Sequence, residues 1–412
     1  MSHNKSTSSL ITLLLALLLT SCGIGTATGT ATPAPTRLST ATGTVTLAPT
    51  RLSTATTVTG NVVRLQQIHM FNASTGWAMT DDLVNGQRRI LRTTTGVAHW
   101  QDVTPVTGKQ SSLIDGSGFF DALTAWVAVG GDPMVVYRTH DGGQSWQQAQ
   151  LRDQGINGAT FFFLNARVGW LMRATGAATG NVGVAVLRTS DGGASWKRIS
   201  ASTFSTTSPS KLPFVGKKMI SFVNETTGWV TVSGFAWLYV THDGGTTWRH
   251  QNIPLPAQVG QAFGPIIIIP PSFFSATDGL LPAIIPNPAG ETITIYVTHD
   301  GGVSWHPTSP VHTGLGSMTI ADAGLIAIAD AQHAWIVSSS HDVKSYQYIH
   351  STVYSTRDGG LHWTQHTVKF SADPTMIDFV SPTQGWAIDE WGSLYQTADG
   401  GQTWVKVTPT IP

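Results

Sequence analysis

Thr139-His-Asp-Gly-Gly-Gln-Ser-Trp146 is the stretch that decides the fold, because the chain repeats it. A degenerate copy ends at Trp100 and has Thr95 in place of the aspartate. Successive motif tryptophans are 41 to 58 residues apart, a period typical of repeat architectures. The six complete copies supply these aspartate and tryptophan pairs: Asp141 and Trp146, Asp191 and Trp196, Asp243 and Trp248, Asp300 and Trp305, Asp358 and Trp363, Asp399 and Trp404.

A second motif alternates with the first. It reads Phe71-Asn-Ala-Ser-Thr-Gly-Trp77 and recurs at residues 163–170, 222–229 and 379–386. Variant copies lie at residues 120–126 and 328–335, and the copy at 274–280 ends in Leu280 instead of tryptophan. Together the two motifs contain 13 of the 15 tryptophans, so most of the tryptophan is predicted to be structural.

Each repeat unit is predicted to contain four short strands. In the third unit these are residues 159–163, 170–173, 182–189 and 196–199, which are rich in β-branched and aromatic residues and bounded by turn residues. Seven such units fill residues 61–412. Four strands per unit and seven units predict an all-β, seven-bladed β-propeller, which buries a long chain by packing each sheet against its neighbours.

The repeated Asp-Gly-Gly turn has a structural explanation. We expect its carboxylate to accept hydrogen bonds from amides one to three residues further on, and its glycines to adopt positive φ. The tryptophan that follows is expected to fill the space between adjacent blades. Seven such turns distributed around a ring cannot converge on one substrate, so they are interpreted as structural and not catalytic.

The N-terminus is predicted to be an export signal. Residues 10–19 form an apolar run that is too short to span a bilayer, and Leu19-Thr-Ser-Cys22 follows it. This resembles the lipobox of bacterial lipoproteins, which implies a signal peptide at residues 1–21, lipidation of Cys22 and attachment to the outer side of the cytoplasmic membrane. An ordinary signal peptide with an incidental cysteine is the alternative. Residues 22–60, rich in Thr, Ala, Gly and Pro, are predicted to form a disordered tether.

The composition excludes several classes of function. The 23 basic and 23 acidic residues balance, and a neutral chain without a cation cluster is a poor candidate for nucleic-acid binding. Cys22 is the single cysteine, which excludes an intrachain disulfide framework and a cysteine-built zinc site. The histidines follow no common zinc spacing, and no glycine-rich phosphate loop occurs. We therefore expect no metal and no cofactor.

The two motifs together resemble a known family. The Asp-Gly-Gly motif is similar to the Asp-box, or BNR, repeat of bacterial sialidases, and its pairing with Phe-x5-Gly-Trp is most similar to the photosystem II stability and assembly factor family. Residues 379–404 carry both motifs, and the resemblance covers residues 61–412. It implies a seven-bladed propeller that binds a reaction-centre subunit precursor, although relatives also occur in bacteria without photosystems. The family's arginine-rich surface patch is not placed on particular residues of this chain.

An enzyme is not expected. Sialidases need an arginine triad, a tyrosine–glutamate nucleophile pair and usually an Arg-Ile-Pro motif, which this sequence lacks. Glu225, Glu291 and Glu390 are its only glutamates, and no pair of carboxylates is evident as acid and nucleophile. Related xyloglucan-cleaving enzymes use two propellers, whereas a chain of this length builds one. No catalytic residue is therefore assigned.

The variable connections are the predicted binding surface. The turns between first and second strands and the Asp-Gly-Gly turns are short and lie on one face, and the remaining connections form the opposite, variable face, where function usually concentrates. An aromatic and basic rim there predicts a protein-binding scaffold or assembly factor of undetermined oligomeric state, with a carbohydrate-binding or glycosidase-like surface protein as the alternative. The alternative interpretation is that Trp237 packs within a strand and that the other residues lie in solvated loops without a binding role. The candidates are Arg173, Lys217, Lys218, Trp237, Lys344, Tyr346, Tyr348 and Trp391.

Overall fold

The structure is a computed structural model of the chain. It describes residues 61–80, 88–106, 114–131, 133–152, 155–156, 158–178, 181–202, 211–213, 218–232, 237–256, 266–287, 290–313, 317–318, 323–342 and 344–412. The predicted signal peptide, Cys22, the tether and Lys217 lie outside these ranges.

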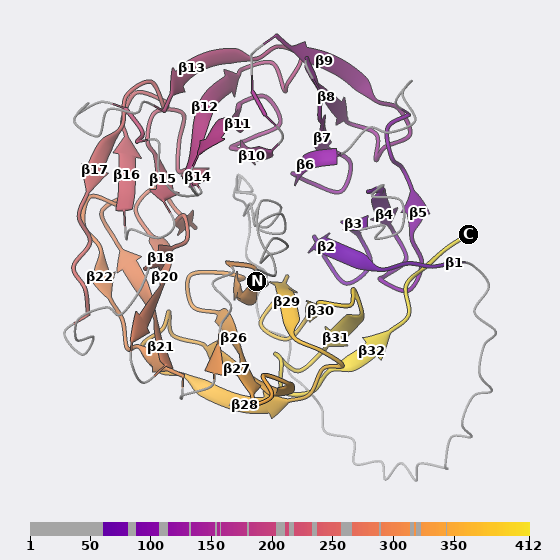
Figure 1. Cartoon of the computed structure of the whole chain (residues 1–412), viewed down its shortest axis with the longest axis vertical. Helices are drawn as coiled ribbons and strands as arrows, with labels where there is room; N and C mark the ends of the chain where they lie inside the picture. Colours follow the sequence, from indigo (N-terminus) through magenta and orange to yellow (C-terminus); the bar gives the residue numbers. More distant parts are fainter. Residues whose placement is uncertain are drawn as a thin grey trace, which may run out of the picture.

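The described residues form seven blades arranged in a ring, which confirms the predicted seven-bladed β-propeller (Figure 1). In each blade the strands are antiparallel neighbours in chain order, with the first strand nearest the centre. The inner strands of blades 5 and 6 and the outer strand of blade 5 are each split into two short pieces. A single 3-10 turn, η1 (Ala323–Leu325), is the one helical element in the part of the chain that the structure describes.

The strands have the following bounds. Blade 1 contains β2 (Leu65–Met70), β3 (Gly76–Thr80), β4 (Ile90–Thr93) and β5 (Gln101–Asp102). Blade 2 contains β6 (Ile114–Phe119), β7 (Ala125–Val129), β8 (Met134–Thr139) and β9 (Gln147–Leu151). Blade 3 contains β10 (Ala159–Phe163), β11 (Gly169–Ala178), β12 (Asn181–Thr189) and β13 (Lys197–Ala201). Blades 4 and 5 contain β14 (Lys218–Phe222), β15 (Gly228–Val232), β16 (Trp237–Thr241) and β17 (Arg249–Gln251); β18 (Ile267–Ile268), β19 (Ser272–Phe273), β20 (Gly279–Asn287), β21 (Gly290–Thr298), β22 (His306–Pro307) and β23 (Val311–His312). Blades 6 and 7 contain β24 (Ser317–Met318), β25 (Ile326–Ile328), β26 (Ala334–His341), β27 (Tyr348–Thr356) and β28 (Thr364–Val368); β29 (Pro374–Phe379), β30 (Gly385–Asp389), β31 (Leu394–Thr397) and β32 (Val405–Val407).

Tryptophans of the second sequence motif join neighbouring blades. Five of the six stack almost parallel on a phenylalanine at the end of the next blade's inner strand, and these five tryptophans are fully buried. Where the indole N–H reaches the next Asp-Gly-Gly turn, it donates to the first glycine's carbonyl, as Trp126 does to Gly192 at 2.8 Å. The stacked pairs, with their centroid distances, are Trp126 and Phe163 (3.3 Å), Trp170 and Phe222 (3.6 Å), Trp335 and Phe379 (3.9 Å), Trp229 and Phe273 (4.9 Å), and Trp77 and Phe119 (5.5 Å).

This stacking corrects the motif boundaries in three blades. The sequence motif was drawn from Phe71, Phe120 and Phe274, but the stacking position is one residue earlier, at Met70, Phe119 and Phe273. Side chains alternate between the two faces of a strand, so a shift of one residue moves the ring to the opposite face. Phe71 is accordingly only half-buried, whereas Phe119 is 4% exposed.

The Asp-Gly-Gly turns are closed by hydrogen bonds that reach further than expected. One Asp141 carboxylate oxygen accepts from the Ser145 amide, four residues on, at 3.0 Å, and the other accepts from the Ser145 hydroxyl at 2.5 Å. The Thr139 hydroxyl accepts from the Gly143 amide and donates to Asp141. Hydrogen bonds from Ser145 and then Thr139 lower the pKa of Asp141 to about 2. The predicted reach of one to three residues is confirmed where Asp243 and Asp399 accept from the amides three residues on, but it missed the amide four residues on.

The turns between first and second strands and the Asp-Gly-Gly turns lie on the same face, as predicted. In every blade the first glycine of the Asp-Gly-Gly turn, or Gly96 in the degenerate copy, donates its amide to a carbonyl of the turn between the first two strands. One such bond joins Gly192 to the Arg167 carbonyl at 2.7 Å. These bonds fix both turns of a blade as one unit, which we call the Asp-Gly-Gly face.

The two ends of the described chain close the ring together. Strand β1 (Asn61–Val62) pairs with β33 (Thr410–Ile411) in a two-stranded ribbon, so the first segment does not extend the last blade directly. Thr410 also accepts from the Trp100 amide at 2.9 Å and donates to the Ala98 carbonyl. The C-terminal strand therefore bridges to blade 1 beside its degenerate Asp-Gly-Gly turn.

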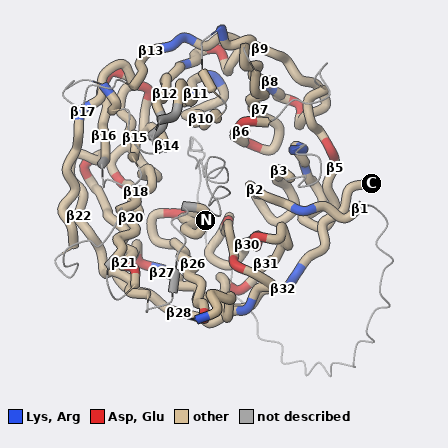
Figure 2. Tube along the Cα trace, in the orientation of Figure 1, with Lys and Arg blue, Asp and Glu red and all other residues tan. Residues whose placement is uncertain are grey.

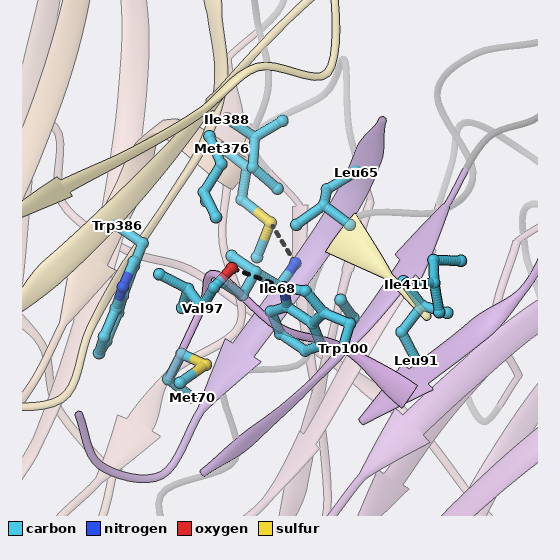
Figure 3. Close-up of a cluster of buried hydrophobic side chains, with 12 residues drawn as sticks. Leu65, Ile68, Met70, Leu91, Val97, Trp100, Met376, Trp386, Ile388 and Ile411 are labelled. Carbon is cyan, nitrogen blue, oxygen red and sulfur yellow. Dashed lines mark hydrogen bonds between the residues drawn. The ribbon is translucent and has the colours of Figure 1, made fainter. Parts of the chain in front are cut away.

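The closing interface has its own hydrophobic cluster (Figure 3). Trp386 of blade 7 lies near Met70, which occupies the place that phenylalanine has in most other blades, and Ile411 joins the same cluster. The buried Nε1 of Trp386 has no hydrogen-bond partner among the described residues. A carboxylate oxygen of buried Asp378 accepts from the Met70 amide at 2.8 Å and ties the two inner strands together.

We expect Trp170→Leu to destabilise the propeller by about 2–4 kcal/mol, because the substitution removes the stack on Phe222 and the hydrogen bond to Gly244 and leaves a cavity. Chemical denaturation measures the change. Trp391→Leu is the matched control, since that tryptophan is 56% exposed and should change stability by less than about 1 kcal/mol. Equal losses for both variants would contradict the structural role of the interblade stack.

Candidate binding surface at blades 6 and 7

The structure separates the predicted rim residues into three groups. Lys344, Tyr346 and Trp391 are exposed, and Tyr346 and Trp391 are 80% and 56% exposed. Tyr348 is half-buried, with its hydroxyl near Ser351 and accepting from the Phe370 amide. Lys218 and Trp237 begin β14 and β16, and only their backbone positions are described.

Arg173 does not belong to the exposed rim, which corrects that prediction. Its side chain is fully buried, and its guanidinium donates to the Gly131 and Gly155 carbonyls at 3.3 and 3.4 Å. The second strand of blade 3 continues to Ala178 instead of ending at residue 173, so Arg173 lies within the sheet. It supplies positive charge beneath the surface, near the buried carboxylate of Asp115.

The connection between β26 and β27 is a tight turn on a long ribbon. Strand β26 ends at His341 and β27 begins at Tyr348, so the connection between them is short. One Asp342 carboxylate oxygen accepts from the amides of Lys344 and Ser345, and the Tyr346 amide donates to the Asp342 carbonyl. Tyr346 adopts φ 56°, a conformation unfavourable for a side chain of this size. The turn thereby holds the Tyr346 ring outward.

The connection between β30 and β31 is organised by another aspartate. Buried Asp389 accepts through one oxygen from the amides of Trp391 and Ser393, and through the other from the Tyr395 hydroxyl at 3.0 Å. Gly392 takes a positive φ of 73°, and its carbonyl accepts from the Leu65 amide of blade 1. This turn presents Trp391 to solvent on a fixed backbone.

A buried contact between side chains links the two turns. The His341 Nε2 lies 3.0 Å from an Asp373 carboxylate oxygen, and both side chains are largely buried. The Asp373 carbonyl accepts from the Glu390 amide at 2.8 Å. Asp373 thus connects the end of β26 in blade 6 to the β30–β31 turn in blade 7.

Burial and neighbouring carboxylates also affect Glu390. Partial burial, followed by the negative charges of Asp373 and Asp389, raises the pKa of Glu390, and His341 partly opposes this. Figure 2 shows acidic residues near β30 and basic residues along the outer edge of blades 6 and 7 near β28 and β32. The β30–β31 turn that carries Trp391 therefore lies at a concentration of carboxylates.

These carboxylates serve mainly to position the loops. Both oxygens of Asp389 and one oxygen of Asp373 are held by hydrogen bonds to protein groups. The sequence prediction considered the three glutamates and missed both aspartates. The signal that could have found Asp389 is its place three residues before Gly392, an arrangement typical of a turn.

The described part of the chain contains no group of three or more His, Cys, Asp or Glu residues placed to hold a metal ion. It also contains no helix that is long and apolar enough to cross a membrane.

Comparisons with known proteins agree on the fold. The solved structure of YCF48 bound to D1 peptide is 17% identical, covers 82% of this chain and 94% of its own length, and superposes with a TM-score of 0.53. YCF48 from Cyanidioschyzon merolae is also 17% identical, with 85% and 97% covered and a TM-score of 0.54. The GH74 xyloglucanase from Xanthomonas campestris is 16% identical, with 85% and 54% covered and a TM-score of 0.54.

A curated relative in sequence is the oligoxyloglucan-reducing end-specific xyloglucanase of Emericella nidulans. It is 26% identical over an alignment of 189 residues, and the alignment covers 41% of this chain. This chain spans only 19% of that enzyme's length. No family model matches the sequence. These likenesses place the chain among propellers that include both a peptide-bound protein and glycoside hydrolases.

We expect Asp115 to make stability depend on pH. Burial raises its pKa to about 6, so the folded state takes up a proton more readily than the unfolded state, and stability falls as the pH rises from about 4 to 6. Asp115→Asn should therefore gain stability relative to the natural protein over this interval, by up to about 3 kcal/mol.

Denaturation at pH 4, 5, 6 and 7 measures this difference. Asp141→Asn is the control, because the pKa of Asp141 is lowered to about 2 and its effect should be constant between pH 5 and 7. A difference between Asp115→Asn and the natural protein that does not change with pH would contradict the prediction.

Proposed function

We propose that this protein is a non-catalytic binding propeller that holds another protein through its variable face at blades 6 and 7. The observation that carries the proposal is the presentation of Tyr346 and Trp391 on two turns fixed by aspartates, the exposed Asp342 and the buried Asp389. Exposed tryptophan and tyrosine on a rigid backbone lose little conformational entropy on binding and are common energetic centres of interfaces.

The surrounding groups fit a protein partner. Ile349, 44% exposed, adds an apolar contact beside Tyr346, and Lys344 adds a positive charge on the same turn. An apolar and aromatic centre with polar groups around it is typical of protein interfaces. YCF48, whose structure with D1 peptide has the same fold, supports a propeller in this role.

A glycan-directed function is the second candidate. The sequence likeness to a xyloglucanase favours it, and exposed aromatic rings beside carboxylates also suit a sugar. The occupation of Asp389 and Asp373 in loop hydrogen bonds favours binding over hydrolysis. The two candidates differ in whether the binding of a protein or the binding of a glycan should depend on Trp391.

Photo-crosslinking tests the proposal. A photo-crosslinking residue replaces Tyr346, once in the natural sequence and once in a Trp391→Ala, Lys344→Ala double variant. We expect a specific crosslinked protein whose yield falls at least tenfold in the double variant, because a central tryptophan often contributes 2 kcal/mol or more, roughly a thirtyfold change in affinity. Mass spectrometry identifies the partner.

Val303→Ala is the matched control, since Val303 is 75% exposed on the Asp-Gly-Gly face. Loss of the crosslink in this variant, or its survival in the double variant, would argue against the proposed surface. Xyloglucan oligosaccharides are offered to the same variants. Trp391-dependent sugar binding or release of reducing ends would replace the protein-binding proposal with the glycan-directed one.

We also propose that the chain is exported and anchored by lipid on Cys22. The Leu-Thr-Ser-Cys sequence at residues 19–22 supports this. Radiolabelled palmitate should label the natural protein and the Ser21→Ala control, which keeps a small residue before the cysteine, but not Cys22→Ser. Labelling of Cys22→Ser to the natural level would exclude the anchor, as would an unlabelled natural protein.

A further inference from the structure

The contact between blades 5 and 6 departs from the other blade boundaries. Leu280 stands where the other blades have tryptophan, and Ile328 of blade 6 stands where most have the stacking phenylalanine. Both partners of the interblade stack are therefore replaced by smaller aliphatic residues at the same boundary. These two side chains belong to one small cluster with Ile295 and Ala334.

A pocket of about 500 Å³ opens at this boundary on the Asp-Gly-Gly face. Leu280, Val297 and Phe274 line its apolar part, and Thr308 contributes from the outer strand side of blade 5. Its size lies within the range of ordinary ligand sites. The pocket thus coincides with the place where the repeat lacks its indole.

The backbone groups that receive an indole elsewhere are present here. At three other boundaries the first glycine of the next Asp-Gly-Gly turn accepts from the indole N–H, at Gly192, Gly244 and Gly400. The equivalent glycine in blade 6 is Gly359, which lines the pocket. Among the described residues none donates a hydrogen bond to its carbonyl oxygen. The turn is held in the usual way, by the Gly359 amide bonding to the Gln332 carbonyl.

The neighbouring glycine is surrounded differently from its equivalents. A Cβ built on Gly193, Gly302 or Gly401 would lie within 4 Å of the preceding blade's tryptophan. A Cβ on Gly360 would instead meet Thr308 and Ile295. Side chains of blade 5 therefore lie beside Gly360, and the open space lies at Gly359, which lines the pocket.

We propose that this pocket binds the tryptophan side chain of a partner polypeptide, with the indole N–H donating to the Gly359 carbonyl and the ring lying between Leu280 and Val297. The chain itself contains the template for this recognition at Trp126, Trp170 and Trp335. This site lies on the face opposite to the proposed partner surface and does not depend on it.

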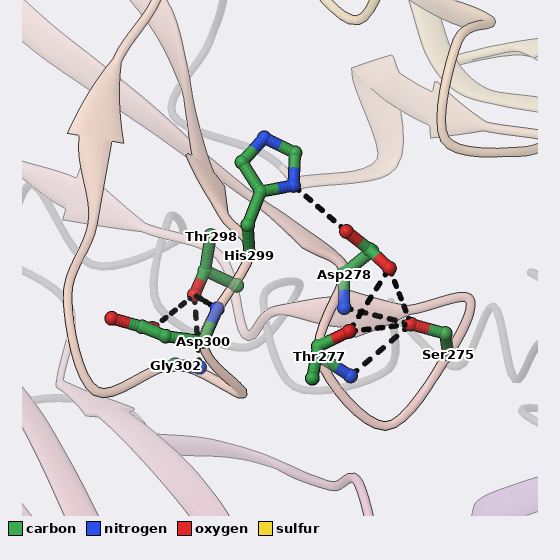
Figure 4. A network of polar contacts seen from close by, with 7 residues as sticks. All are labelled: Ser275, Thr277, Asp278, Thr298, His299, Asp300 and Gly302. Carbon is green, nitrogen blue, oxygen red and sulfur yellow. Dashed lines mark hydrogen bonds and ion pairs between the residues drawn. The ribbon is translucent and has the colours of Figure 1, made fainter.

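The mouth of the pocket indicates what surrounds that tryptophan. Asp278 and His299 line it, and the His299 ring lies 2.7 Å from the Asp278 carboxylate, joining the two turns of blade 5 (Figure 4). Asp358 lies on the blade 6 side, and Leu361, 55% exposed, completes the mouth. Two carboxylates beside an apolar opening favour a tryptophan flanked by basic residues.

Fluorine NMR of the full-length chain with short acetylated peptides tests the proposal. The probe is Lys-Trp-Lys carrying 5-fluorotryptophan, compared by competition with Lys-Leu-Lys and with a peptide containing 1-methyltryptophan. We expect the leucine peptide to compete at least tenfold more weakly. We expect the methylated peptide to compete about threefold to tenfold more weakly, because it lacks the donor to Gly359.

Leu280→Trp restores the repeat residue and should abolish peptide binding while raising the thermal midpoint. Leu280→Met conserves volume and is the matched control. Val106→Ala should leave binding unchanged, because Val106 is 94% exposed and follows β5 of blade 1, away from the pocket. Full binding by Leu280→Trp, or equal competition by all three peptides, would overturn the proposal.

The comparison of the methylated and unmethylated tryptophan peptides needs no protein variant, so it tests the proposed hydrogen bond even if Leu280→Trp does not fold. Free 5-fluoroindole forms the last arm. Binding of 5-fluoroindole without any binding of the tryptophan peptide would overturn the assignment to a polypeptide partner.

Discussion

The stack of a tryptophan on the next blade's phenylalanine is the interaction on which the ring depends. It places a large apolar surface between sheets, and a second tryptophan, from the Asp-Gly-Gly turn, contacts the same phenylalanine edge-on, as Trp196 does with Phe163 at 5.9 Å. At three boundaries the indole N–H donates to a turn glycine, as Trp126 does to Gly192, so the closed turn takes part in the contact between blades. The repetition of the Asp-Gly-Gly motif is therefore explained by blade-to-blade packing and does not indicate repeated chemistry.

Most of this architecture could be predicted from spacing. The four strands expected in the third unit are β10 to β13 with shifted ends, since the motif tryptophans and turns mark each blade. The stacking position could not be assigned where aromatic residues are adjacent, as at Phe119 and Phe120, because choosing between them requires knowing which face of the strand points to the next blade. Arg173 was misplaced for a related reason, since the length of β11 depends on its ribbon with β12.

The candidate surface was predictable only in its exposed part. Tyr346 and Trp391 are exposed on the face opposite to the Asp-Gly-Gly turns. Successive connections of an antiparallel blade alternate between the two faces, and this alone predicts their position. The contact between His341 and Asp373, which joins blades 6 and 7, brings together residues 32 apart in sequence. Such pairing depends on the register of neighbouring blades, which carries no local sequence signal.

Two blades depart from the repeat, blade 1 in its Asp-Gly-Gly turn and blade 5 in its missing tryptophan, and the structure replaces the lost contacts in only one of them. At blade 1 the degenerate turn with Thr95 is supported by β33, whose Thr410 pairs with the Trp100 backbone and whose Ile411 joins the hydrophobic cluster. At blades 5 and 6 both stacking partners are smaller, and the described residues leave a pocket at that position. Five of the other six boundaries keep the stack of a tryptophan on a phenylalanine. Loss of the internal indole therefore turns a structural position into surface that can recognise another chain.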